Sequence, residues 1–207
     1  MRFVHLQVQT AYSLLESTIS IPEWAAYAKA LHYDTLAITD RNVMYGAFPF
    51  YKACRENGIK PIIGMTADIM SSFEPDTAYP VVLLAKNETG YRHLMKISSA
   101  IQTRPEPGIF IKWLRAYSDG LIAFTPGLEG EIEQALVRGD EARAEEVAVL
   151  YRDIFGPSFY LALENNGTAQ AKKVLPDMHA LSEKLGIPEV AAANVKYLKK
   201  EDAFAHE

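Results

Sequence analysis

The chain has 207 residues, of which 49% are hydrophobic and 23% are charged, and it carries a formal net charge of −5. This composition is typical of a folded globular protein with room for one large domain or two small ones. The net negative charge argues against a basic nucleic-acid clamp, and the single cysteine, Cys54, excludes an internal disulfide. One cysteine favours a reducing, cytoplasmic compartment, and no apolar run is long enough to span a membrane.

Strand-like and helix-like segments alternate along the chain. The strands are short, apolar on both faces and rich in β-branched residues, as is typical of buried parallel strands. Seven are predicted, at residues 3–8, 35–39, 61–66, 81–85, 121–124, 159–163 and 188–193. Apolar residues at helical spacing predict helices at residues 21–31, 47–57, 91–101, 140–155 and 171–185, and a short one that ends at Gly139.

The repeated strand-then-helix order predicts an α/β fold with parallel strands and outer helices. A distorted (β/α)7 barrel, similar to a TIM barrel, fits the length, and an open doubly wound sheet is the alternative. Polar loops are expected at residues 71–77 and 104–108. We expect one domain over residues 1–207, in which residues 199–207 begin a helix that has no C-cap or breaker.

The first strand carries Gln7 and Gln9, which point to the same face because side chains alternate along a strand. Histidines at that spacing hold transition-metal ions, whereas neutral amides are much poorer ligands for them. The pattern is that of a metal-binding strand without its first two ligands. In parallel α/β folds, function sits where the strands end at their carboxyl edge. Further polar residues follow the other strands there, namely Asp40, Arg41, Thr66, Asp68, Thr125, Glu164, Asn166, Asn194 and Lys196.

Five blocks of sequence carry a resemblance to a known family. They are FVHLQVQT at 3–10 with YSLL at 12–15; LAITD at 36–40 with MYGA at 44–47 and FYKA at 50–53; GIKPIIG at 58–64; LLAKN at 83–87 with GY at 90–91; and KKEDA at 199–203 with AHE at 205–207. Together they resemble the PHP (polymerase and histidinol phosphatase) domain. The form they resemble most is the one at the start of the DNA polymerase III alpha subunit of Gram-positive bacteria.

The resemblance implies a set of ligand positions at the strand ends. Family members with an intact site hold a cluster of metal ions there with His, Asp, Glu and Cys. Such sites support phosphoester hydrolysis, including a proofreading exonuclease in some polymerases. By this resemblance, Asp40 is the one position in this chain that keeps the ligand residue of the family. The substituted positions are Gln7, Gln9, Arg41, Thr66, Pro80, Gly127, Ala162, Asn166, Asn194 and Lys196. We therefore expect a degenerate site with no metal and no catalytic residue in this domain.

Two of the substituted positions, Arg41 and Lys196, are cations. A unit charge about 4 Å from a divalent ion, at an effective dielectric constant near 20, is repelled by roughly 8 kcal/mol. That energy is about the free energy of micromolar binding, so the two charges argue against a metal cluster. Our hypothesis is that Arg41 or Lys196 takes over the electrostatic role of the metals by pairing with Asp40 or Glu164.

The resemblance implies a catalytically silent, structural domain that supports a polymerase core. The parent chain would be a DNA-directed DNA polymerase whose magnesium ions bind outside this segment. Its partners would be the rest of the polymerase chain, DNA and replisome components. No membrane partner is expected. In some relatives the equivalent domain docks a proofreading subunit, and nothing in this sequence identifies such a surface. The alternative is a metal-dependent phosphoesterase or 3′–5′ exonuclease with a remodelled site. A stand-alone binding module is disfavoured by the unfinished helix at residues 199–207.

Overall fold

A computed structural model describes residues 3–199 and 201–202 of the chain. Most of the helix predicted at residues 199–207 lies outside these ranges. Among the described helices, none is long and apolar enough to cross a membrane.

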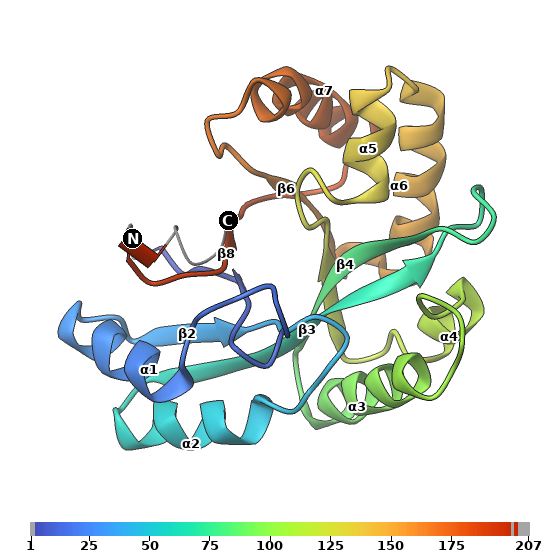
Figure 1. Cartoon of the computed structure of the whole chain (residues 1–207). Coiled ribbons are helices and arrows are strands. Elements are labelled where there is room, and N and C mark those ends of the chain that lie inside the picture. The colour runs from blue at the N-terminus through green and yellow to red at the C-terminus, as the bar shows by residue number, and fades with distance from the viewer. Residues whose placement is uncertain (1–2, 200, 203–207) are drawn as a thin grey trace.

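The strands curl into a distorted barrel (Figure 1). Six of them form one sheet in the order β2 (Thr35–Ile38), β3 (Lys60–Met70), β4 (Ala78–Ala85), β5 (Leu121–Phe124), β6 (Phe159–Leu163) and β7 (Glu189–Ala191). The remaining two, β1 (Gln7–Val8) and β8 (Asn194–Val195), pair with each other in parallel. The Thr39 amide at the end of β2 donates to the Val8 carbonyl of β1 over 2.8 Å, and β8 follows β7 after two residues. This bond and the β1–β8 pair bring the two ends of the six-stranded sheet together.

The predicted α/β barrel is confirmed, but the direction of one strand was predicted wrongly. Strand β4 runs antiparallel to both of its neighbours, β3 and β5, whereas the other pairs are parallel. Only residues 71–77 connect β3 to β4. A parallel pair needs a crossover of a dozen or more residues, so a connection this short permits only a hairpin.

In the described part of the chain, helices α1 to α7 cover the outside of the sheet in three groups (Figure 1). The first group, beside β2 and β3, is α1 (Ile21–Ala30) and α2 (Ala47–Glu56). The second, below β4, is α3 (Glu88–Gln102) and α4 (Ile111–Ala116), of which α4 was not predicted. The third is α5 (Glu131–Val137), α6 (Glu141–Phe155) and α7 (Ala169–Leu185), with a 3-10 turn at Gly156–Ser158. The Asp140 side chain caps α6 by accepting from the Arg143 amide.

The apolar core is divided in the same way. The largest cluster lies between the sheet and α3 to α7 and contains Leu94, Leu114 and Phe159. A second cluster lies under α1 and α2, where the rings of Trp24 and Phe50 stack with centroids 5.1 Å apart. The third is small and includes Val82, Leu84, Phe124, Ala162 and Ala192. At the carboxyl edge of the strands, buried polar side chains replace this apolar packing.

Candidate functional site

The retained carboxylate, Asp40, is held by hydrogen bonds from the segment that follows β1. Its Oδ1 accepts from the Thr10 amide at 2.6 Å and from the Ser13 hydroxyl at 2.8 Å, and its Oδ2 accepts from the Thr10 hydroxyl at 2.8 Å. Burial raises the pKa of Asp40, and the bonds from Thr10 and Ser13 act against that rise. Asp40 therefore anchors the end of β2 to the segment after β1, and its oxygens are already occupied.

Three amides stand at substituted ligand positions on the closing strands. Gln7 and Gln9 are only 1% and 2% exposed, and Gln7 pairs with Asn194 across β1 and β8. The Gln7 Nε2 donates to the Pro126 carbonyl over 3.2 Å. The amide oxygens of Gln7, Gln9 and Asn194 have no hydrogen-bond partner within the described part of the chain. These positions therefore offer neutral oxygen atoms, which are weak ligands for transition metals.

Arg41 makes the main ionic contacts of the barrel mouth. Its Nε and Nη2 donate to the two oxygens of Asp68 at 3.2 and 3.0 Å, which is a two-bond contact. Its Nη1 lies 3.5 Å from Glu16 and 3.3 Å from Glu129. Burial alone would lower the pKa of Arg41, but these carboxylates, Asp68 above all, raise it. The guanidinium is therefore held by acidic groups that follow β1 and β5 and by one within β3.

Lys196 belongs to the same group of charges. Its Nζ lies 3.6 Å from Glu129 and 4.0 Å from Glu16. We call Arg41, Lys196, Asp68, Glu16 and Glu129 the mouth cluster. The described ion pairs of Arg41 and Lys196 are with Asp68, Glu16 and Glu129, and not with the predicted Asp40 and Glu164.

Those two carboxylates have other contacts. Asp40 is enclosed by Thr10 and Ser13, so it does not face the cations. Glu164 Oε1 accepts a long, 3.5 Å bond from the Asn194 amide. A Cβ atom on residue 127 would collide with the Oε2 atom of Glu164. Gly127 therefore leaves room for Glu164, and its φ of +91° also favours glycine.

The other substituted positions have structural contacts. Thr66 donates through its hydroxyl to the Thr39 carbonyl over 3.1 Å and joins β3 to the end of β2. Pro80 faces Asp68 in the antiparallel β3–β4 ladder, and Ala162 is buried in the core. Asn166 lies on an exposed turn, where it accepts hydrogen bonds from Thr168. The structure thus brings most of the predicted positions to one mouth and places Asn166 outside it.

One buried acid was not singled out in the sequence. Glu133 on α5 is 2% exposed, and burial raises its pKa to about 8. The Thr125 hydroxyl and nearby main-chain amides oppose this rise, although none meets ordinary hydrogen-bond geometry, and the charge of Glu164 adds to it. The signal in the sequence was the position of Glu133 among the apolar residues of a short helix, next to Ile132. A pKa of about 8 favours the protonated form of Glu133 at neutral pH.

The residues at the mouth do not fit a metal cluster. Within residues 3–199 and 201–202, no group of three or more His, Cys, Asp or Glu side chains is arranged to hold a metal ion. The ligand positions supply neutral amides and one carboxylate that Thr10 and Ser13 already occupy. Arg41 and Lys196 add positive charge, which repels a cation.

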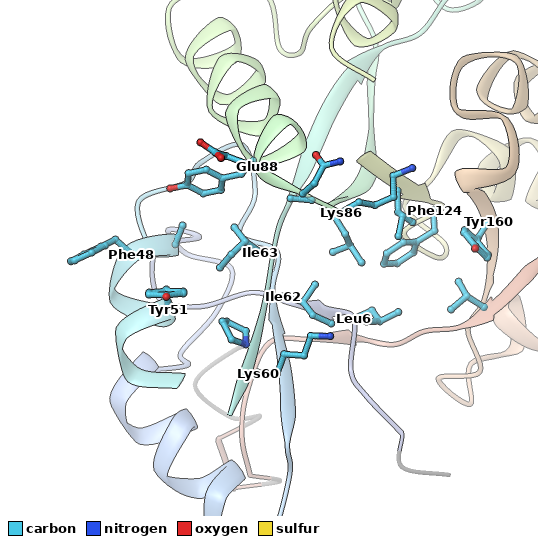
Figure 2. A pocket seen from close by; sticks show the side chains of 18 residues that line it. Leu6, Phe48, Tyr51, Lys60, Ile62, Ile63, Lys86, Glu88, Phe124 and Tyr160 are labelled. Atoms are coloured by element: carbon cyan, nitrogen blue, oxygen red, sulfur yellow. The ribbon is translucent and has the colours of Figure 1, made fainter. Parts of the chain in front are cut away.

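A large cavity of about 820 Å³ lies at the other end of the barrel. Figure 2 shows Phe48 and Tyr51 of α2 on one side, Tyr160 of β6 on the other, and Ile62 and Leu6 between them. The lining is mainly apolar and comes from the beginnings of β3, β5, β6 and β7 and from the end of the reversed strand β4. Barrel enzymes carry their chemistry at the opposite, carboxyl edge, so the cavity is suited to packing rather than to catalysis.

Comparison with known proteins identifies the family. The PHP domain model matches residues 5–166, which is most of the chain. This chain belongs to the PHP domain family. This chain is 44% identical over its whole length to DNA polymerase III subunit alpha of Bacillus subtilis strain 168. It is 38% identical, over 99% of its length, to the subunit of that name from Halalkalibacterium halodurans. A third relative with that name, from Treponema pallidum, is 36% identical. The chain spans only 18 to 19% of the length of these relatives.

Solved structures with the same fold are distant in sequence. An amidohydrolase from Chromobacterium violaceum, solved with bound sulfate and no metal, matches 96% of the PHP domain and 89% of its own chain with a TM-score of 0.62 at 11% identity. A putative metal-dependent phosphoesterase from Bifidobacterium adolescentis matches 93% of the PHP domain and 87% of its own chain with a TM-score of 0.64 at 10% identity. At these identities the likeness establishes the barrel fold alone.

The first prediction concerns the mouth cluster. Arg41→Ala removes the two-bond contact and leaves Asp68, which is 8% exposed, with fewer donors. We expect the free energy of unfolding to fall by about 1–3 kcal/mol in denaturant titration. As a control, Arg92→Ala breaks an exposed pair with Glu88, and its cost should stay below about 0.5 kcal/mol. Equal effects of the two substitutions would contradict a stabilising role for the mouth cluster.

The second prediction concerns Glu133. Its pKa is about 8 in the folded state against a reference value of 4.5, so the free energy of unfolding should fall as the pH rises from about 4.5 to about 8. Glu133→Gln removes this loss, because the amide stays neutral at every pH. We expect the variant to be more stable than the native protein at pH 7 by on the order of 1–3 kcal/mol.

Denaturant titrations across this pH range measure the Glu133 effect. A matched control is Glu23→Gln on the exposed surface of α1, which should leave the pH dependence unchanged. If Glu133→Gln destabilises the protein to the same extent at acidic and neutral pH, the side chain is not a protonated buried acid.

Proposed function

We propose that this PHP domain is a catalytically silent, structural part of a bacterial DNA polymerase III alpha subunit. The observation that carries the proposal is 44% identity along the whole chain to a protein of that name, combined with a mouth whose ligand positions hold amides and cations. Because the chain spans 18% of that relative, template-directed DNA synthesis belongs to the remainder of the polypeptide. Magnesium would act there, at carboxylates outside this domain.

The loss of hydrolytic function follows from the charges of the mouth. A metal-dependent phosphoesterase needs ions that polarise the phosphoryl oxygens and generate a nucleophile. Arg41 and Lys196 stand at two of the family's ligand positions, and their carboxylate partners hold them at the mouth. The cluster ties segments after β1, β2, β5 and β8 to β3, which is a stabilising task that a metal cluster also performs. The proposed domain therefore keeps the barrel rigid without chemistry of its own.

Partners and location follow from the same proposal. The rest of the polymerase chain is the first partner, and DNA and other replisome components are reached through it. A cytoplasmic location agrees with such a polymerase and with the single buried Cys54. Docking of a proofreading subunit would need a surface that the described contacts do not identify.

The apolar cavity supports the structural role. Phe48 is 72% exposed and Tyr51 is 48% exposed, and both line the cavity of Figure 2 together with Ile62 and Ile63. Exposed apolar patches of this kind mark interaction surfaces. Since most of the relatives' length lies outside this chain, we assign the occupant to apolar side chains from another part of the same polypeptide.

The third prediction tests catalytic silence in the intact protein that carries this domain. We expect primer extension on a template, no release of nucleotides from a labelled 3′ end in manganese without nucleotide triphosphates, and no tightly bound metal at the barrel mouth. Gln7→Ala should change none of these measurements. Stoichiometric metal together with hydrolysis that Gln7→Ala abolishes would instead establish an active phosphoesterase, and absence of primer extension would contradict the polymerase assignment.

The fourth prediction tests the cavity in the same intact protein. Phe48→Ser with Tyr51→Ser should lower the free energy of unfolding by about 1–3 kcal/mol, because aromatic anchors contribute most to a packed interface. Scanning calorimetry gives the change. Tyr27→Ser with Leu31→Ser on α1 is the matched control, since those side chains are also exposed and do not line the cavity. If both pairs of substitutions have the same effect, the cavity is not covered by the rest of the polypeptide.

A further inference from the structure

A segment of opposite charge to the rest of the chain lies on α3, α4 and the loop between them. Residues 91–116 contain five Lys or Arg and one acidic residue, Glu106, whereas the whole chain has 21 Lys and Arg against 26 Asp and Glu. The cations are spread over 24 residues of sequence, so they form no basic run. They are Arg92, Lys96, Arg104, Lys112 and Arg115.

Ring contacts bring cations of α3 and of the loop after it close to α4 and to Tyr117. Both helices lie below β4 in the view of Figure 1. The Lys96 ammonium of α3 is 5.3 Å from the centroid of the Tyr117 ring, just after α4. The rings of Tyr117 and Trp113 lie 5.9 Å apart, and the Arg104 guanidinium lies 4.4 Å above the Trp113 ring. Two aromatic rings thus connect Lys96 to Arg104 and hold both cations in place.

Four of these cations have no ion-pair partner among the residues that the structure describes. Among the ion pairs of the described residues, Arg92 pairs with Glu88, and none includes Lys96, Arg104, Lys112 or Arg115. Lys96, Lys112 and Arg115 are exposed, and Lys112 lies 5.6 Å from the exposed Phe110 ring. We call these four residues the α3–α4 strip. Lys96 and Arg104 are linked through the two rings, and Lys112 and Arg115 lie on α4 together with Trp113. Cations without ion-pair partners create a positive potential that attracts a polyanion.

We propose that the α3–α4 strip binds the phosphodiester backbone of DNA. The choice of DNA among polyanions rests on the proposed polymerase function, whereas the strip itself rests on the packing and charge of this domain. Lys96 lies over the Tyr117 ring and Arg104 over the Trp113 ring, so these rings position cations. Contacts of this kind go to phosphates, do not depend on base sequence and add affinity that falls with salt.

Substituting two lysines gives a measurable effect. Each phosphate contact contributes about 0.9 to the slope of log affinity against log salt, so Lys96→Gln with Lys112→Gln should lower that slope by about 1.8. At about 0.15 M salt the same loss corresponds to roughly 30-fold weaker binding. The matched control is Lys172→Gln with Lys173→Gln, which removes two exposed charges from α7.

The test uses the intact protein, a fluorescent primer–template and anisotropy titrations at several salt concentrations. We expect the control to bind like the native protein, and Lys96→Arg with Lys112→Arg to bind like it also, because both charges remain. Unfolding temperatures of all variants establish that they are folded.

Three results would overturn the assignment. The first is a Lys96→Gln, Lys112→Gln variant that binds DNA with the same affinity and salt slope as the control. The second is a fall in the affinity of this variant with no change in its salt slope. The third is an equal loss of affinity in the Lys96→Arg, Lys112→Arg variant, which keeps both charges. Primer extension by the native protein, measured separately, tests the proposed function: its absence contradicts the polymerase assignment and leaves the comparison of DNA affinities intact.

Discussion

Closure of the barrel at β1 is the constraint on which the mouth depends. The strand has two paired residues, so its ladder alone supplies few hydrogen bonds. Side chains add the rest: the Thr39 hydroxyl accepts from the Val8 amide at 2.9 Å, and Asp40 accepts from Thr10 and Ser13. Since Asp40 is buried, each of these donors satisfies a group that would otherwise be desolvated without a partner. Asp40 thus fixes where β1 lies between β2 and β8.

The mouth cluster lies outside this closure and extends it across the barrel. Arg41 follows Asp40 directly, so the anchored end of β2 sets the position from which the guanidinium reaches Asp68. The Arg41 amide also donates to the Ser13 hydroxyl at 3.0 Å, which links the two sets of contacts. Glu16 and Glu129 then lie between Arg41 and Lys196. Charged side chains whose partners come from different strands restrain one another, because moving one strand end separates several pairs.

Local sequence predicted most of the described helices and every described strand except β8, since short apolar runs are visible one segment at a time. The direction of β4 was missed, although the short connection at residues 71–77 was recognised as a loop. The partners of Arg41 could not be read from the sequence, because Glu16 and Glu129 come from other loops and Asp68 from β3. The contact of Arg104 with Trp113 likewise depends on how the loop after α3 lies against α4. Besides the local elements α4 and β8, what the sequence did not predict was tertiary pairing.

The pairing of β1 with β8 also constrains the order of folding. Gln7 pairs with Asn194, so the contact that completes the barrel joins segments separated by nearly the whole domain. Contacts between residues far apart in sequence form slowly, because a long loop must close first. During synthesis, the edge of β1 that pairs with β8 can be paired only after β8 has left the ribosome. Until then the edge of β1 that pairs with β8 has no strand partner, so closure of the barrel is expected to be a late step of folding.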